Sequence, residues 1–117
     1  MTPYDKQQIE QALRRVDQKA DEVLSLVIGR QRLSPGDRQL VKYEYDNLRS
    51  SLRGGVGGHV FESESGRNFA IRSGDLIGSE LSASSSDSPD SIASSLRGVK
   101  SGVSYRLMEL SKYQVVE

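Results

Sequence analysis

Apolar residues recur at alternating steps of four and three positions along the first quarter of the chain. The series is Ile9, Leu13, Val16, Ala20, Val23 and Val27. Because an α-helix turns once every ~3.6 residues, this spacing gathers the apolar side chains into one stripe, as in helices that pack side by side. The pattern predicts a helix over residues 3–28, and Gly29 is the kind of residue that ends one.

The same spacing occurs in two further segments. In residues 35–53 the apolar stripe consists of Val41, Tyr45, Leu48 and Leu52, whereas Leu40 and Tyr43 fall beside it. In residues 89–113 it consists of Ile92, Leu96, Val99, Val103, Leu107 and Leu110. We expect a helix in each segment. The connection between the first two helices is short, so these should form an antiparallel hairpin.

The three prolines mark where these helices begin. Each follows a hydroxyl residue, in the pairs Thr2-Pro3, Ser34-Pro35 and Ser88-Pro89. A hydroxyl at the N-cap accepts a hydrogen bond from a backbone N–H that has no partner within the helix. Proline at the first helical position lacks only a donor that would have stayed unpaired. The prolines therefore predict helix starts at residues 3, 35 and 89.

Residues 54–78 have a different pattern. The run Gly54-Gly55-Val56-Gly57-Gly58 ends the second helix and forms a joint, because glycine is costly inside a helix. Phe61, Phe69 and Ile71 share a face if the chain folds back through residues 65–67, which predicts a small β-hairpin. The alternative is an irregular loop with a short helix near residues 75–81. Residues 79–88 are rich in serine and are expected to be a linker.

These elements predict a mainly α fold, a small helical bundle within a single domain of residues 1–117. It comprises an antiparallel helical hairpin, a third long C-terminal helix and a short insertion that the pattern favours as a β-hairpin. Gly98 and Gly102 lie one turn apart on the third helix, which suits close approach of another backbone. With Tyr45, they are our candidate interface residues. An apolar stripe left over after packing would be buried by self-association, so we expect a homo-oligomer, with a dimer favoured.

Charge and composition narrow the functional classes. The 117 residues contain 16 basic and 16 acidic side chains, and this balance argues against a nucleic-acid binder or a polybasic membrane anchor. The chain contains no cysteine, which excludes disulfide scaffolds and thiol chemistry. The first 15 residues lack the apolar core of a signal peptide, and no apolar run is long enough to span a bilayer. We expect a cytoplasmic protein with no membrane partner.

A basic stripe on the second predicted helix is the main candidate for ligand binding. Arg38, Lys42, Arg49 and Arg53 fall on neighbouring positions of one helix face. Together with the glycine run and with Arg67 or Arg72, they could bind a phosphate group or a nucleotide. The alternative, which we favour, is a solvated flank whose aliphatic stems cover the apolar stripe.

Catalytic and metal-binding patterns are weak. His59 is the only histidine and has no cysteine beside it, so it suggests neither a metal ligand nor a catalytic base. The carboxylate pairs Asp17/Asp21 and Glu62/Glu64 lack the spacing of a calcium loop. We therefore expect no cofactor and no enzymatic activity. The favoured function is a protein-interaction module, such as an adaptor, inhibitor or structural subunit; the alternative is a binding protein for a phosphate-bearing small molecule.

Overall fold

The computed structural model describes residues 1–53, 55–56 and 60–113. Within these ranges the chain forms four helices and no strand. Their bounds are α1 Pro3–Val27, α2 Pro35–Ser51, α3 Glu64–Ser79 and α4 Pro89–Ser111. The prediction of a mainly helical fold is therefore confirmed.

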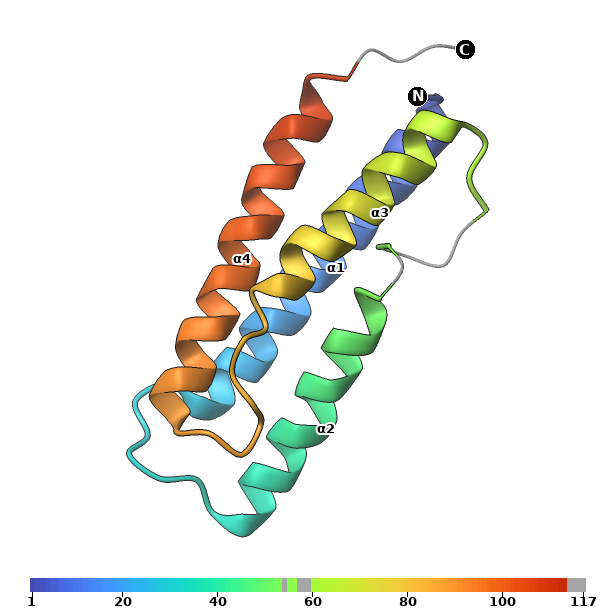
Figure 1. The fold of residues 1–117 in the computed structure, drawn as a ribbon. Coiled ribbons are helices and arrows are strands. Elements are labelled where there is room, and N and C mark those ends of the chain that lie inside the picture. Colours follow the sequence, from blue (N-terminus) through green and yellow to red (C-terminus); the bar gives the residue numbers. More distant parts are fainter. Residues whose placement is uncertain (54, 57–59, 114–117) are drawn as a thin grey trace.

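The two long helices, α1 and α4, lie side by side and run in opposite directions (Figure 1). Polar contacts at two levels hold this register. Lys6 near the start of α1 donates to the backbone carbonyl of Tyr113 just beyond α4, and Asp17 and Asp21 further along α1 pair with Lys100. Every residue of the predicted stripe on α1 is buried, as is every residue of the stripe on α4 except the half-buried Leu107. The apolar spacing thus identified the seam between these helices.

The shorter helices α2 and α3 follow one another along the length of this pair. Figure 1 shows α2 beside the C-terminal half of α1 and α3 beside its N-terminal half. The end of α2 meets α3 at two glycines: Leu52 lies against both Gly74 and Gly78. The result is an elongated molecule of 51 × 22 × 18 Å, in which α2 packs mainly on α1, and α3 packs on α4 and, less extensively, on α1.

Hydroxyl N-caps explain where the helices begin. Thr2, Ser34 and Ser88 each accept a hydrogen bond from the backbone N–H three residues on, and proline occupies the next position, as predicted. The helices end one or two residues earlier than predicted, at Val27, Ser51 and Ser111. Gly29 has a φ of 72° just after α1, a conformation that glycine adopts without strain.

The predicted β-hairpin is wrong, because the segment forms α3 instead. Ser63 caps this helix by accepting from the N–H of Gly66 at 3.1 Å. The buried face of α3 consists of Gly66, Phe69, Ala70, Ser73, Gly74 and Ile77. Only Phe69 and Ile77 in this set are large and apolar, so small residues conceal the helical period. Ile71, which the hairpin would have placed beside Phe69, is 38% exposed on another face of the helix.

Candidate interaction surface

Two arginines of the predicted basic stripe bind the segment that joins α3 to α4. Arg49 Nη2 donates to the backbone carbonyls of Leu81 at 3.0 Å and Ala83 at 3.3 Å. Arg38 Nη1 donates to the carbonyl of Ser86 at 3.0 Å. A guanidinium group carries five N–H donors and no acceptor, so it is well suited to gathering several carbonyl oxygens. These two cations hold the serine-rich segment against α2.

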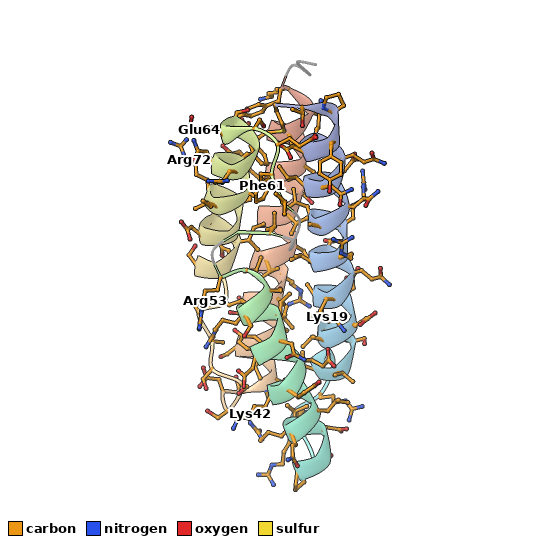
Figure 2. All side chains as sticks on the ribbon, turned by 90° about the vertical axis from the view of Figure 1, so that its right-hand side faces the viewer. Lys19, Lys42, Arg53, Phe61, Glu64 and Arg72 are labelled. Carbon is orange, nitrogen blue, oxygen red and sulfur yellow. The ribbon has the colours of Figure 1, made fainter. Side chains whose placement is uncertain are left out.

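The other two members of the stripe remain at the surface. Figure 2 shows Lys42 and Arg53 on the side of α2 away from α1. Both residues are exposed. Of the four predicted ligand-binding residues of α2, two therefore bind the segment after α3 and two are exposed to solvent. The four side chains do not converge on one point.

Tyr45 lies inside the chain, with none of its surface exposed. Its hydroxyl donates to the carbonyl of Ala83 at 2.6 Å and lies 3.2 Å from Ser95 Oγ. Ser95 in turn accepts from the N–H of Ala83 and donates to the carbonyl of Glu80. The buried tyrosine and serine thus satisfy backbone groups of the same segment that Arg49 binds. Sequence reasoning missed Ser95, because a single serine in a serine-rich stretch carries no distinguishing signal.

The two glycines predicted at an interface are in contact with the end of α3. A Cβ atom at Gly102 would lie 3.3 Å from Ile77 Cγ1, and one at Gly98 would lie 2.5 Å from a carboxylate oxygen of Glu80. The close approach inferred from their spacing therefore occurs within one chain, between α4 and the C-terminal end of α3.

The carboxylate pair on α1 binds an internal cation. Lys100 Nζ lies 3.0 Å from Asp17 Oδ1 and 2.8 Å from Asp21 Oδ1. These contacts, chiefly the hydrogen bond to Asp21, raise the pKa of Lys100 above its ordinary value. Among the described residues, no group of three or more histidine, cysteine or acidic side chains is placed to hold a metal ion.

A second carboxylate joins the first turn of α1 to the start of α3. Asp5 is fully buried, and its oxygens accept from the backbone N–H groups of Glu62 and Ser63 and from Ser63 Oγ at 2.6 Å. A Cβ atom at Gly66 would lie 2.5 Å from Asp5 Oδ2, so glycine allows this contact. Negative charge is favourable at a helix N-terminus.

The predicted carboxylate pair Glu62/Glu64 lies beside this contact. Glu62 Oε1 accepts a hydrogen bond from Thr2 Oγ1, whereas Glu64 is the first residue of α3 and is exposed.

A polar groove separates α3 from the C-terminal half of α4. It has a volume of about 450 Å³ and is lined by Ser65, Asn68, Phe69 and Arg72 of α3 and by Tyr105, Arg106, Glu109 and Tyr113 of α4 and its C-terminal end. Phe69 is buried, whereas Asn68, Arg72 and Tyr105 are exposed. The walls therefore combine cationic, aromatic and amide side chains that solvent can reach.

Arg106 is held in place within this groove. Its guanidinium carbon lies 4.0 Å from the centroid of the Phe69 ring, and Nε donates to Ser73 Oγ at 2.8 Å. The ring of Tyr113 meets Phe69 edge to face, with 5.2 Å between centroids. Stacking and a hydrogen bond together restrict the orientation of the guanidinium plane. Arg106 was not among the predicted site residues, because its position can be recognised only once α3 is known to be a helix.

Of the two arginines predicted on the middle segment, only Arg72 lines the groove. Figure 2 shows it on the side of α3 away from α1. Arg67 is exposed on α3 and does not line the groove. His59 and three glycines of the predicted joint, Gly54, Gly57 and Gly58, lie outside the described residues.

Comparisons with models of protein families, with curated proteins and with solved structures find no match to this chain. The structure describes no helix with the length and apolar character needed to cross a bilayer.

Proposed function

We propose that this protein is a non-enzymatic interaction module that binds a protein partner through the α3–α4 groove and the exposed side chains beside it. The observation that carries the proposal is the combination of arginine and tyrosine in this groove. Arg72, Arg106, Tyr105 and Tyr113 all line it, and Tyr105 and Tyr113 are 49% and 40% exposed. Tyrosine and arginine are enriched among the residues that dominate binding energy in protein interfaces.

The neighbouring surface supports the same function. Met108 lies three residues from Tyr105 on α4, and Leu76 lies one turn beyond Arg72 on α3; they are 51% and 40% exposed. Methionine and aromatic residues are more frequent in interfaces than on the rest of a protein surface. A partner that covered these side chains would remove apolar area from water, at roughly 25 cal/mol per Å² before the costs of association.

Site-specific crosslinking tests this proposal. A photoreactive phenylalanine analogue in place of Tyr105 should crosslink to one defined protein in the native host, and the same analogue in place of Tyr43 should not. Tyr43 is the matched control, since it is 64% exposed on α2 and does not line the groove. The crosslinked protein, purified separately, should bind the unmodified chain and lose at least tenfold in affinity for Tyr105→Ala but not for Tyr43→Ala.

Two outcomes would contradict the proposal. Equal crosslinking from both positions would show that the groove has no selective partner. A product formed only between two copies of this chain would assign the surface to self-association, and sedimentation at two protein concentrations would then show a dimer.

A further inference from the structure

We propose that the groove recognises an acidic segment of the partner, and that carboxylate side chains of this segment bind Arg106 and Arg72. This inference rests on the proposed function, because it names the chemistry of the partner at the same surface. Three features of the groove carry it: the orientation of Arg106, the balance of charge, and the position of most lining residues inside helices.

Arg106 retains hydrogen-bonding capacity after its internal contacts. Nε binds Ser73 Oγ, and Nη2 makes one longer contact of 3.5 Å with the carbonyl of Phe69. The remaining N–H donors of the guanidinium group make no hydrogen bond to the described residues. The ring of Phe69 and the hydroxyl of Ser73 already orient the guanidinium plane of Arg106. A carboxylate would therefore bind N–H groups that are preorganised, and less side-chain entropy would be lost on binding.

The charges in the groove favour an anion. Within the described ranges, neither Arg72 nor Arg106 lies within 4.0 Å of a carboxylate, whereas Glu109, the acidic residue of the lining, pairs with Lys112 at 3.3 Å. The groove therefore has an excess of positive charge in a chain whose formal net charge is zero. A partially buried guanidinium binds carboxylate through charge-assisted hydrogen bonds, which are stronger than those between neutral groups.

The walls suit a peptide better than a free phosphate. Phosphate sites in proteins are commonly built from backbone N–H groups at helix N-termini or in glycine-rich loops. Asn68, Arg72, Tyr105 and Glu109 instead lie inside helices, where the backbone N–H groups are already hydrogen-bonded. Ser65 is the one lining residue in the first turn of a helix, so the groove offers few backbone donors. Glu109 also repels a doubly charged phosphate more than a singly charged carboxylate. Asn68 and the tyrosine hydroxyls can bond to the backbone of an extended or helical segment.

Nuclear magnetic resonance titration of the full chain tests the inference. The probe is a capped octapeptide that alternates glutamate and leucine; the comparison probes are the same peptide with glutamine at every glutamate position, and inorganic phosphate. We expect the glutamate peptide to shift amide resonances of residues 65–73 and 105–113 in a saturable manner. The glutamine peptide should bind at least tenfold more weakly. Added salt should lower the affinity for the glutamate peptide, because it screens the attraction between the charges.

Arginine substitutions connect the effect to the groove. Arg72→Gln and Arg106→Gln should each lower the affinity for the glutamate peptide by about tenfold, which is the loss expected for one hydrogen bond to a charged group. Arg67→Gln removes the same charge from an exposed position of α3 outside the groove, and Arg97→Gln does so on α4; both should bind as the unchanged protein does. The amide spectrum of each variant shows whether the fold is retained. If Arg106→Gln unfolds, the titration of Arg72→Gln provides the test.

Equal binding of the glutamate and glutamine peptides, or equal losses in Arg67→Gln and Arg72→Gln, would overturn the inference. Localised shifts with inorganic phosphate but not with the glutamate peptide would also overturn it and assign the groove to a phosphate-bearing ligand. These results differ from failure of the proposed function. If a partner loses affinity for Tyr105→Ala but binds Arg72→Gln and Arg106→Gln normally, the proposed function stands. Only the inference that the partner presents an acidic segment is then refuted.

Discussion

Helices α2 and α3 lie one after the other along the α1–α4 pair, but they use their polar side chains differently. On α2, Tyr45, Arg49 and Arg38 bind backbone groups of residues 81–86. On α3, Arg72 is exposed and faces a groove, and no carboxylate of the described chain pairs with it. Arg38 and Arg49 donate to the chain's own carbonyls and stabilise the fold, whereas Arg72 has no such partner among the described residues and is available to another molecule. The comparison separates structural arginines from candidate recognition residues, although both types look alike in the sequence.

The largest expected effect comes from the glycine at which α2 meets α3. A Cβ atom at Gly74 would lie 2.5 Å from the carbonyl oxygen of Leu52 and 2.6 Å from that of Gly55. Both are backbone atoms, so the turn after α2 would have to move. Gly74→Ala should lower the free energy of unfolding by about 3 kcal/mol in chemical denaturation, at the upper end of the usual cost of overpacking.

Gly36 on α2 provides the control, because a Cβ atom there would have no neighbour within 4 Å. Gly36→Ala should change stability little or raise it by about 0.4–1 kcal/mol through a less flexible unfolded chain. Similar losses in both variants would mean that the close approach of α2 to α3 does not depend on Gly74.

A smaller effect is expected for the buried phenol. Tyr45→Phe removes the donor to Ala83 and leaves its carbonyl with fewer partners in the core, which should cost about 1–3 kcal/mol. Tyr105→Phe removes a hydroxyl from the groove wall and should change the free energy of unfolding by less than about 0.5 kcal/mol. Thermal and denaturant unfolding of the two variants measure the difference. Equal costs would contradict the assignment of one tyrosine to the fold and the other to the surface.

The smallest expected difference is between the two arginines. Arg49→Gln removes two hydrogen bonds to carbonyls and should lower the free energy of unfolding by about 1 kcal/mol, because the contact is partly open to water. Arg72→Gln should stay within about 0.5 kcal/mol of the unchanged protein. A loss for Arg72→Gln as large as that for Arg49→Gln would place Arg72 among the residues that stabilise the fold and would remove it from the recognition surface.

Local signals predicted three of the four helices. The stripe on α1 and the Ser-Pro pairs at α2 and α4 depend on neighbours within one or two turns, and their physical basis is the helical period and the unpaired N–H groups of a first turn. Leu40 and Tyr43, placed beside the stripe of α2, are indeed exposed. The prediction failed at α3, where Gly66, Ala70, Ser73 and Gly74 form most of the buried face. Such a face packs by close approach, and an apolar periodicity does not reveal it.

The candidate site was predicted only in part. The basic stripe of α2 was recognised, but not the carbonyls that Arg38 and Arg49 bind, because residues 81–87 reach α2 only through the path of the folded chain. Arg72 was included in the ligand-binding set, and it lines the groove. Arg106 was omitted, because no pattern in the neighbouring sequence indicates its contacts with Phe69 and Ser73.

The sequence by itself determined the helical class, three helix starts and the apolar seams of α1, α2 and α4, because these depend on spacing and capping over a few residues. Only the tertiary structure decided which arginines bind the serine-rich segment and which line a groove. That distinction depends on contacts between residues more than thirty positions apart, such as Arg49 with Leu81 and Arg106 with Ser73. Such contacts form when α3, whose small residues allow close packing, lies against α4 and brings the serine-rich segment onto α2.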